Sequence, residues 1–243
     1  MTKVRSILML SLILCLAAVT MSACGKVKNL TEGQSVAPSQ APAASVAPAA
    51  AESLCTKAVQ ATPVDKTIST VKSYAAAPEM TIDASKTYCA IVQTSKGNLT
   101  LELFAKDAPK TVNNFVFLAK NNFYNGIIFH RIIQSFMIQT GDPEGTGAGG
   151  PGYSFEDELT GPQNYEPGVV AMANAGANTN GSQFFINTVD NSKNLPKNYS
   201  IFGKVVAGMD TVTKIAATPV EAGGEGSTPT EKVTIDSVQI IEL

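Results

Sequence analysis

The stretch "IIFHRIIQSFMIQTGD", residues 127–142, decides how the rest of the chain is interpreted. It is almost uncharged, and its β-branched and aromatic residues are typical of β-strands. The run predicts strands over 127–133 and 136–140, joined by a bend at Gln134 and Ser135. Two short strands at mid-chain indicate a sheet protein, and the flanking sequence supplies more strands.

A single arginine, Arg131, stands in this run beside His130, the only histidine of the chain, and no other charged residue occurs between Asn121 and Gly141. Such a guanidinium is either solvated at a sheet edge or directed at a ligand. Adjacent strand residues point to opposite faces. Alternation therefore places Arg131 with Phe129 on one face and His130 on the other, where we expect the imidazole to be hydrogen-bonded.

Further strand-like runs follow this pattern on both sides of the stretch. They cover 88–94, 99–104, 168–174, 182–188, 200–205 and 232–241. Two helices are predicted, one capped by Asp107 with Pro109 in its first turn, and one over 207–217. Many short strands with only two helices predict a mainly β fold, a closed antiparallel eight-stranded β-barrel capped by two α-helices.

The length of the chain indicates how many domains it forms, and its net charge argues against a nucleic-acid partner. A chain of 243 residues with 44% apolar residues can bury a full core, and we expect one sizeable domain with appendages. The net charge is −2, which provides no electrostatic footprint for nucleic acid. No nucleic-acid partner is expected.

The N-terminus resembles a secretory signal. Lys3 and Arg5 precede an apolar core over 7–19 that is too short to span a bilayer. The ending "MSAC" resembles the lipobox of bacterial lipoproteins, which predicts a signal peptide over 1–23 and lipidation of Cys24, for example by palmitate. The alternative is an ordinary signal with an incidental cysteine. An anchored protein would lie on the bacterial cell membrane, facing the extracytoplasmic side.

The chain after Cys24 divides into three parts. Residues 24–52 form an Ala/Pro/Ser-rich linker whose composition cannot build a core, 53–85 are a poorly defined segment before the domain, and 86–243 form the domain. Cys55 and Cys89 remain after the signal and the anchor are assigned. They are either paired or two free thiols, and the sequence does not decide between these alternatives.

Several motifs for other chemistries are weak. "GTGAGG" at 145–150 matches GxGxxG, but Pro151 follows and no helix opens, so we interpret it as a loop and expect no cofactor. A serine hydrolase would need His130 as its base, and no GxSxG elbow occurs. A single histidine without a CxxC motif makes a metal site unexpected.

Three blocks together resemble the cyclophilin family of peptidyl-prolyl cis-trans isomerases: "FHRIIQSFMIQTGD", "MANAGANTNGSQFFINT" and "FGKV". The resemblance covers roughly 86–243. It implies a cyclophilin-like fold, isomerisation of Xaa-Pro bonds in extracytoplasmic proteins to assist their folding, proline-containing unfolded or peptide substrates, and a monomer. The alternative function is a membrane-tethered proline-peptide binding or chaperone module with incidental isomerase activity.

The resemblance also implies the roles of the site residues. Arg131 is the catalytic hydrogen-bond donor. The proline ring is held by four apolar side chains, those of Phe136, Met137, Phe185 and Leu195. The substrate backbone is held by Gln139 and Asn174, the groove is lined by Ala173 and Gln183, and Tyr199 faces the pocket. Two positions depart from the eukaryotic pattern, since Asn194 replaces a common tryptophan and Tyr199 a common histidine. Weak cyclosporin binding is therefore expected.

Overall fold

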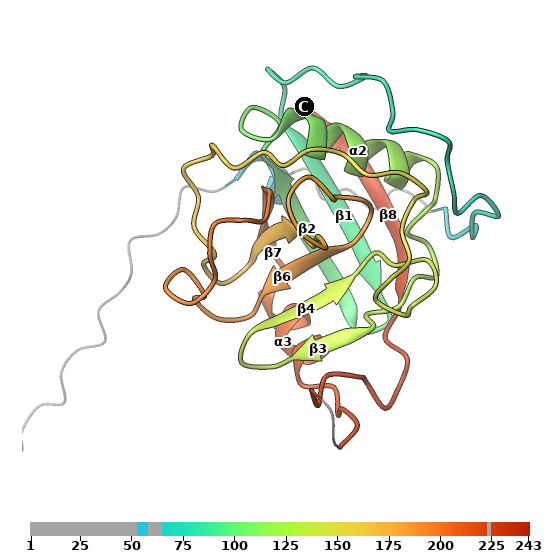
Figure 1. Ribbon diagram of the computed structural model, residues 1–243, viewed down its shortest axis with the longest axis vertical. Helices are drawn as coiled ribbons and strands as arrows, with labels where there is room; N and C mark the ends of the chain where they lie inside the picture. The colour runs from blue at the N-terminus through green and yellow to red at the C-terminus, as the bar shows by residue number, and fades with distance from the viewer. Residues whose placement is uncertain (1–52, 58–64, 223–224) are drawn as a thin grey trace, which may run out of the picture. The chain divides into compact units, whose positions relative to one another are not determined.

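The computed structural model describes residues 53–57, 65–222 and 225–243. Within them, eight strands form one antiparallel sheet in the order β3-β4-β6-β5-β7-β2-β1-β8 (Figure 1). The strands are β1 (Tyr88–Thr94), β2 (Gly97–Leu103), β3 (Arg131–Ile133), β4 (Met137–Thr140), β5 (Val169–Met172), β6 (Phe184–Asn187), β7 (Ile201–Ala207) and β8 (Ile235–Glu242). The helices are α1 (Leu54–Lys57), α2 (Pro109–Lys120) and α3 (Met209–Ala216).

The sheet is a half-barrel and not the closed barrel predicted from the sequence. β3 and β8 are its two ends, and no ladder joins them in the described part of the chain. The segment before β3 meets the start of β8 instead: Ile128 and Thr234 form an isolated bridge, and Ile235 exchanges backbone hydrogen bonds with Gly126 and Ile127. The cause is local, because β3 is only three residues long and begins at Arg131. The mainly β class with antiparallel strands is confirmed, and closure of the barrel is wrong.

Several strands of the sheet are buried on both faces. On β6, Phe184 belongs to the main hydrophobic cluster, whereas its neighbour Phe185 belongs to a second, smaller cluster. On β5, Val170 and Ala171 divide in the same way. Because successive side chains alternate between two apolar environments, these strands have continuous apolar sequences. The second cluster is the one that underlies the candidate site.

Helix α2 starts with the predicted proline but without the predicted cap. The Asp107 carboxylate does not cap it and accepts a hydrogen bond from Gln163 Nε2 at 2.7 Å. The Glu158 carboxylate instead accepts the backbone N–H groups of Lys110 at 3.1 Å and Thr111 at 2.8 Å. A carboxylate distant in sequence thus satisfies the free donors and complements the positive end of the helix.

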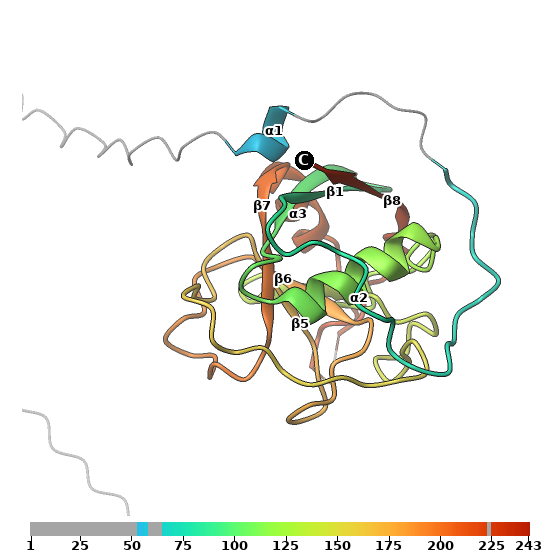
Figure 2. The ribbon, with the colours of Figure 1, turned by 90° about the horizontal axis from the view of Figure 1, so that it is seen from above.

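The segment before the sheet lies around the outside of α2 (Figure 2). We call residues 65–85 the N-terminal strap. The backbone N–H of Thr81 donates to Asn113 Oδ1 on α2 at 2.8 Å. The Tyr74 ring contacts the Phe117 ring edge-on, with 5.1 Å between the ring centroids. The strap therefore packs on α2 through both polar and aromatic contacts.

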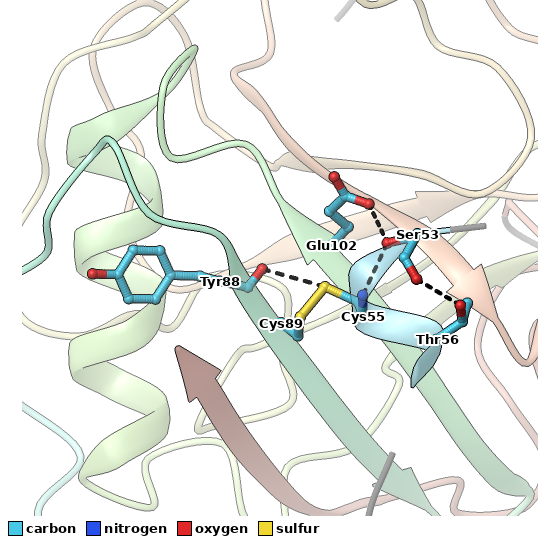
Figure 3. The surroundings of a disulfide bond; sticks show 6 residues. All are labelled: Ser53, Cys55, Thr56, Tyr88, Cys89 and Glu102. Atoms are coloured by element: carbon cyan, nitrogen blue, oxygen red, sulfur yellow. Dashed lines mark hydrogen bonds between the residues drawn. A yellow bond between two sulfur atoms is a disulfide. The ribbon is translucent and has the colours of Figure 1, made fainter. Parts of the chain in front are cut away.

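Cys55 and Cys89 form a disulfide, which resolves the alternatives that the sequence leaves open (Figure 3). Both residues are fully buried. Ser53 supports the same corner, because its hydroxyl donates to the Glu102 carboxylate on β2. The disulfide attaches α1 to β1. Helix α1 precedes the domain boundary predicted at residue 86, and β1 follows it.

Among the described residues, no helix is long and apolar enough to cross a membrane. The predicted signal peptide over 1–23, the lipidation of Cys24 and the linker over 24–52 lie outside the described residues. They remain predictions.

Candidate active site

Four neighbouring strands place the key side chains in one row. The register pairs Arg131 on β3 with Gln139 on β4, Gln139 with Phe185 on β6, and Phe185 with Ala171 on β5. Residues directly opposite each other in a ladder point to the same face. The row therefore lies on the face that carries the second hydrophobic cluster, to which Phe185 and Ala171 belong.

The two residues before Arg131 do not follow strand alternation. Phe129 is buried in the main core, and its N–H donates to the Val233 carbonyl at 2.9 Å, so its predicted place beside Arg131 is wrong. Both ring nitrogens of His130 are buried and have no hydrogen-bond partner among the described residues, where the predicted hydrogen bond is therefore absent. Burial lowers the pKa of His130, with Arg131 acting in the same direction and Asp142 opposing them.

The row opens into a pocket of about 220 Å³. Its lining combines one guanidinium, two side-chain amides and an otherwise apolar or aromatic wall. The lining residues are Arg131, Phe136, Met137, Gln139, Ala173, Asn174, Phe185, Leu195 and Tyr199. The structure thus brings together nine of the ten residues that the family resemblance names. The tenth, Gln183, lies beside this pocket in an adjoining hollow of about 550 Å³ that shares Gln139 with it.

Tyr199 forms an aromatic wall of the pocket. Its ring meets Phe185 edge-on, with 5.6 Å between centroids and an interplanar angle of 87°. Tyr165 lies behind it and fixes its backbone, because the Tyr165 hydroxyl donates to the Tyr199 carbonyl and accepts its N–H, both at 3.0 Å. Tyr165 was not identified from the sequence, since it lies outside the motif blocks.

A chain of amides connects Arg131 to the Gly-rich loop. Arg131 NH1 donates to Gln139 Oε1 at 3.3 Å, and Gln139 Nε2 donates to Gln183 Oε1 at 2.9 Å. Gln183 Nε2 then donates to the carbonyls of Gly147 at 3.0 Å and Gly149 at 2.8 Å. The "GTGAGG" motif is therefore a loop, as interpreted from the sequence, and it lines the adjoining hollow.

The loop owes its shape to Asp142. This carboxylate accepts the N–H groups of Glu144 at 2.7 Å, Thr146 at 2.9 Å and Gly147 at 2.6 Å. Burial acts to raise the pKa of Asp142, but the backbone donors outweigh it and lower the pKa overall. An ionised carboxylate that accepts several backbone N–H groups strongly stabilises the conformation of the loop that supplies them.

Arg131 has a second partner that the sequence does not indicate. Its Nε donates to Glu225 Oε2 at 2.8 Å and its NH2 to Glu225 Oε1, while the guanidinium carbon lies 5.9 Å from the centroid of the Phe136 ring. The hydrogen bond to Glu225 raises the pKa of Arg131. The same contact is the largest cause that lowers the pKa of Glu225 to about 2. Both groups are therefore charged at neutral pH.

Asn174 lines the pocket and is hydrogen-bonded to neighbouring loop backbone. Its side-chain amide donates to the Asn198 carbonyl at 2.9 Å, and its Oδ1 accepts the N–H of Gly176 at 3.3 Å. The side chain thus fixes the rim of the pocket. Asn194, at the position of the family's common tryptophan, is exposed beside Leu195.

No group of three or more His, Cys, Asp and Glu residues in the described ranges is arranged to hold a metal ion.

A family model described as "Cyclophilin type peptidyl-prolyl cis-trans isomerase/CLD" matches residues 89–240. The chain belongs to the cyclophilin family. This cyclophilin is 44% identical over 156 residues to a "Peptidyl-prolyl cis-trans isomerase-like 1" of Gibberella zeae, which covers 63% of this chain and 94% of the fungal protein. It is 46% identical over 155 residues to a mouse "Peptidylprolyl isomerase domain and WD repeat-containing protein 1", covering 62% of this chain but only 24% of the mouse protein.

A solved structure gives the same fold. A cyclophilin-type isomerase of Cryptosporidium parvum, crystallised in the presence of the dipeptide Ala-Pro, superposes with a TM-score of 0.59 at 36% identity. The superposition covers 63% of this chain and 98% of that protein. This cyclophilin is a peptidyl-prolyl cis-trans isomerase, and its reaction is rotation about the Xaa-Pro peptide bond.

Proposed function

We propose that Arg131 is the catalytic residue of this isomerase and that it acts on the twisted peptide bond. Rotation about an amide faces a barrier of ~18–20 kcal/mol, because resonance is lost on the way. As the bond twists, the prolyl nitrogen regains its lone pair and accepts a hydrogen bond from a neighbouring guanidinium. This interaction is stronger in the twisted state than in either planar isomer, so it lowers the barrier.

The observation that carries this proposal is the position of the guanidinium at the edge of an apolar pocket. Arginine has five N–H donors and keeps its proton at any relevant pH. Glu225 accepts the Nε donor and one NH2 donor, and NH1 donates to Gln139 Oε1 and Met137 Sδ, which leaves the second NH2 donor for a substrate among the described contacts. No covalent step is needed, since a fixed and permanently charged donor is sufficient.

The pocket suits a single proline ring. Its volume of about 220 Å³ is smaller than the ~300–1,000 Å³ of sites for drug-sized ligands. In this proposal the proline ring is held, and water is excluded, by the side chains of Phe136, Met137, Phe185 and Leu195. Tyr199 forms the side wall of the pocket. Gln139 and Asn174 hold the peptide backbone, and a longer peptide continues past Ala173 and Gln183 over the adjoining hollow. Crystallisation of the Cryptosporidium relative in the presence of Ala-Pro supports a proline-containing substrate.

Replacement of Arg131 tests the proposal. Arg131→Ala should lower turnover of an Ala-Pro peptide about 10²- to 10³-fold, by analogy with the loss of one oxyanion-hole donor, while peptide affinity changes little. Arg131→Lys should also be poor, because the planar fork is lost. Exchange NMR spectroscopy on the full chain measures turnover, and titration measures binding.

The rival function, a peptide-binding module with incidental isomerase activity, uses the same pocket. It gains support if a folded Arg131→Ala variant retains near-normal turnover. A thermal melt of each variant establishes that the comparison is between folded proteins.

We also propose that this cyclophilin is a bacterial lipoprotein acting on the extracytoplasmic side of the membrane, anchored through Cys24 after removal of residues 1–23. The signal-like sequence and the "MSAC" ending support this location. The Cys55–Cys89 disulfide supports it independently, because disulfides persist in oxidising compartments. We expect a monomer, since one chain supplies the whole lining of the pocket.

A further inference from the structure

Glu225 lies in a loop far from the motif blocks of the family. The loop is closed at its base by the bridge between Val220 and Pro229. Glu225 is 94 residues from Arg131 in sequence, yet its carboxylate accepts hydrogen bonds from both Nε and NH2 of that side chain. Two parallel charge-assisted hydrogen bonds between planar groups fix orientation as well as distance.

The carboxylate is itself held in place from the loop side. Ser227 Oγ donates to Glu225 Oε2 at 2.8 Å, and the Ser227 carbonyl accepts the N–H of Ile132 at 2.8 Å. Ile132 follows Arg131 directly on β3. The loop is thus hydrogen-bonded to the strand that carries Arg131, and its carboxylate is positioned relative to the backbone of that strand.

The hydrogen bonds to Glu225 fix the orientation of the Arg131 guanidinium, and the donor that remains free is available for catalysis. Glu225 holds the Nε side of the guanidinium, and NH1 points to Gln139 Oε1 at 3.3 Å and to Met137 Sδ at 3.7 Å. An unpaired arginine would have to lose the freedom of a long side chain each time it reached the twisted bond. A paired arginine has already lost that freedom in the free enzyme, which is electrostatic preorganisation.

We propose that Glu225 is a positioning residue of the isomerase, which orients the Arg131 guanidinium toward the prolyl nitrogen without touching the substrate. This inference rests on the proposed role of Arg131. Glu225 remains ionised across the physiological range, since its hydrogen bond to Arg131 lowers its pKa to about 2. The charge of Glu225, and with it the attraction between the two groups, therefore does not change with pH across this range.

The test variant is Glu225→Gln in the full chain, purified in mild detergent. Its control is Glu231→Gln, which breaks another ion pair of the same region, that of Glu231 with Lys96. The two pairs are matched in exposure, at 51% and 30% for Glu225 and Arg131 and at 54% and 30% for Glu231 and Lys96. The measurements are turnover of an Ala-Pro peptide by exchange NMR spectroscopy, peptide Kd by titration, and the nitrogen–proton NMR signal of Arg131 Nε.

Glu225→Gln should lower turnover roughly tenfold while Kd changes by less than about twofold, because misplacement of a catalytic group by a fraction of an ångström affects mainly the transition state. The Arg131 Nε signal should shift and exchange faster with water. Glu231→Gln should change none of the three. In a double-mutant cycle, Glu225→Gln should cost nothing further in an Arg131→Ala background.

Two outcomes would overturn the inference. Unchanged turnover in Glu225→Gln, with Arg131→Ala inactive, refutes the positioning role and leaves the proposed function intact. Faster turnover in Glu225→Gln shows that the carboxylate restrains Arg131 instead of aiding it. Near-normal turnover in Arg131→Ala refutes the proposed function itself, so the two failures are distinguishable.

Discussion

At the scale of single residues, His130 and Arg131 are adjacent but have opposite surroundings. Arg131 is charged in a partly buried position, and Glu225 supplies a compensating charge. His130 has no partner among the described residues, and burial lowers its pKa. A buried imidazole without partners is most stable in its neutral form, since charging it would cost desolvation that no contact repays.

The state of His130 predicts how stability depends on pH. Its pKa in the folded protein lies below the unfolded value of 6.5, so the unfolded chain takes up the proton first on acidification. Stability should therefore be complete above about pH 6.5 and fall as pH decreases through that value. Thermal melts at about pH 7.5 and about pH 5.5 measure the effect.

The chain simplifies this experiment because His130 is its only histidine, and carboxylates titrate at lower pH. In His130→Phe, the decrease in melting temperature between the two pH values should largely disappear. An equal decrease in both proteins would contradict the prediction.

The site could be predicted from sequence where the family's motifs name its residues, both in strands, as for Gln139 and Phe185, and in irregular segments, as for Leu195. Arg131, Gln139 and Phe185 belong to long motif blocks, and strand pairing then brings them into one row. Glu225 and Tyr165 could not be predicted in this way. They lie in irregular segments outside these motifs, where no periodicity relates a residue to its distant partner.

At the scale of elements, the start of α2 illustrates the same limit. The local pattern favours Asp107 as the cap, because an acidic residue precedes proline in the first turn. In the fold, the Glu158 carboxylate occupies that position and bonds to two N–H groups of the first turn and to the Thr111 hydroxyl. A tertiary contact has replaced the local one.

The cap gives a second stability prediction. Glu158→Gln should destabilise the protein by about 1 kcal/mol, the usual value of a helix cap, and lower its melting temperature. Glu156→Gln is a suitable control, because Glu156 pairs with the side chain of Lys110 on the surface and its partner is about half exposed. Exposed pairs contribute about 0–1 kcal/mol. Equal effects of the two substitutions would show that Glu158 is not a cap.

The boundaries of the strands also show what sequence can and cannot specify. The predicted runs 127–133 and 168–174 are longer than β3 and β5. Apolar composition marks which residues are buried, but a residue such as Phe129 is equally buried in a loop against the core. Composition therefore locates the strands approximately, whereas backbone hydrogen bonding sets where each strand ends. The barrel is open because no ladder forms between β3 and β8 in the described residues.

At the scale of the whole molecule, the disulfide and the N-terminal strap connect the domain to the chain that precedes it. Cys55 is bonded to Cys89 on β1, and the strap between them packs on α2. A loop of this length, 34 residues in sequence separation, is expected to contribute about 3 to 4 kcal/mol through the entropy of the unfolded chain. The attachment point of the preceding sequence is therefore fixed on the sheet.

The last prediction concerns the anchor. Cys24→Ala should abolish incorporation of a labelled fatty acid and move the protein from the membrane fraction to the soluble fraction, since each buried methylene contributes about 0.8 kcal/mol to membrane binding. Cys15→Ala, in the predicted signal peptide, is the matched control and should keep the label. Isomerase activity should be unchanged in both variants, because all residues that line the pocket lie between 131 and 199. Label retained in Cys24→Ala would rule out this residue as the lipidation site, whereas loss of label together with loss of activity would mean that the domain depends on its anchor.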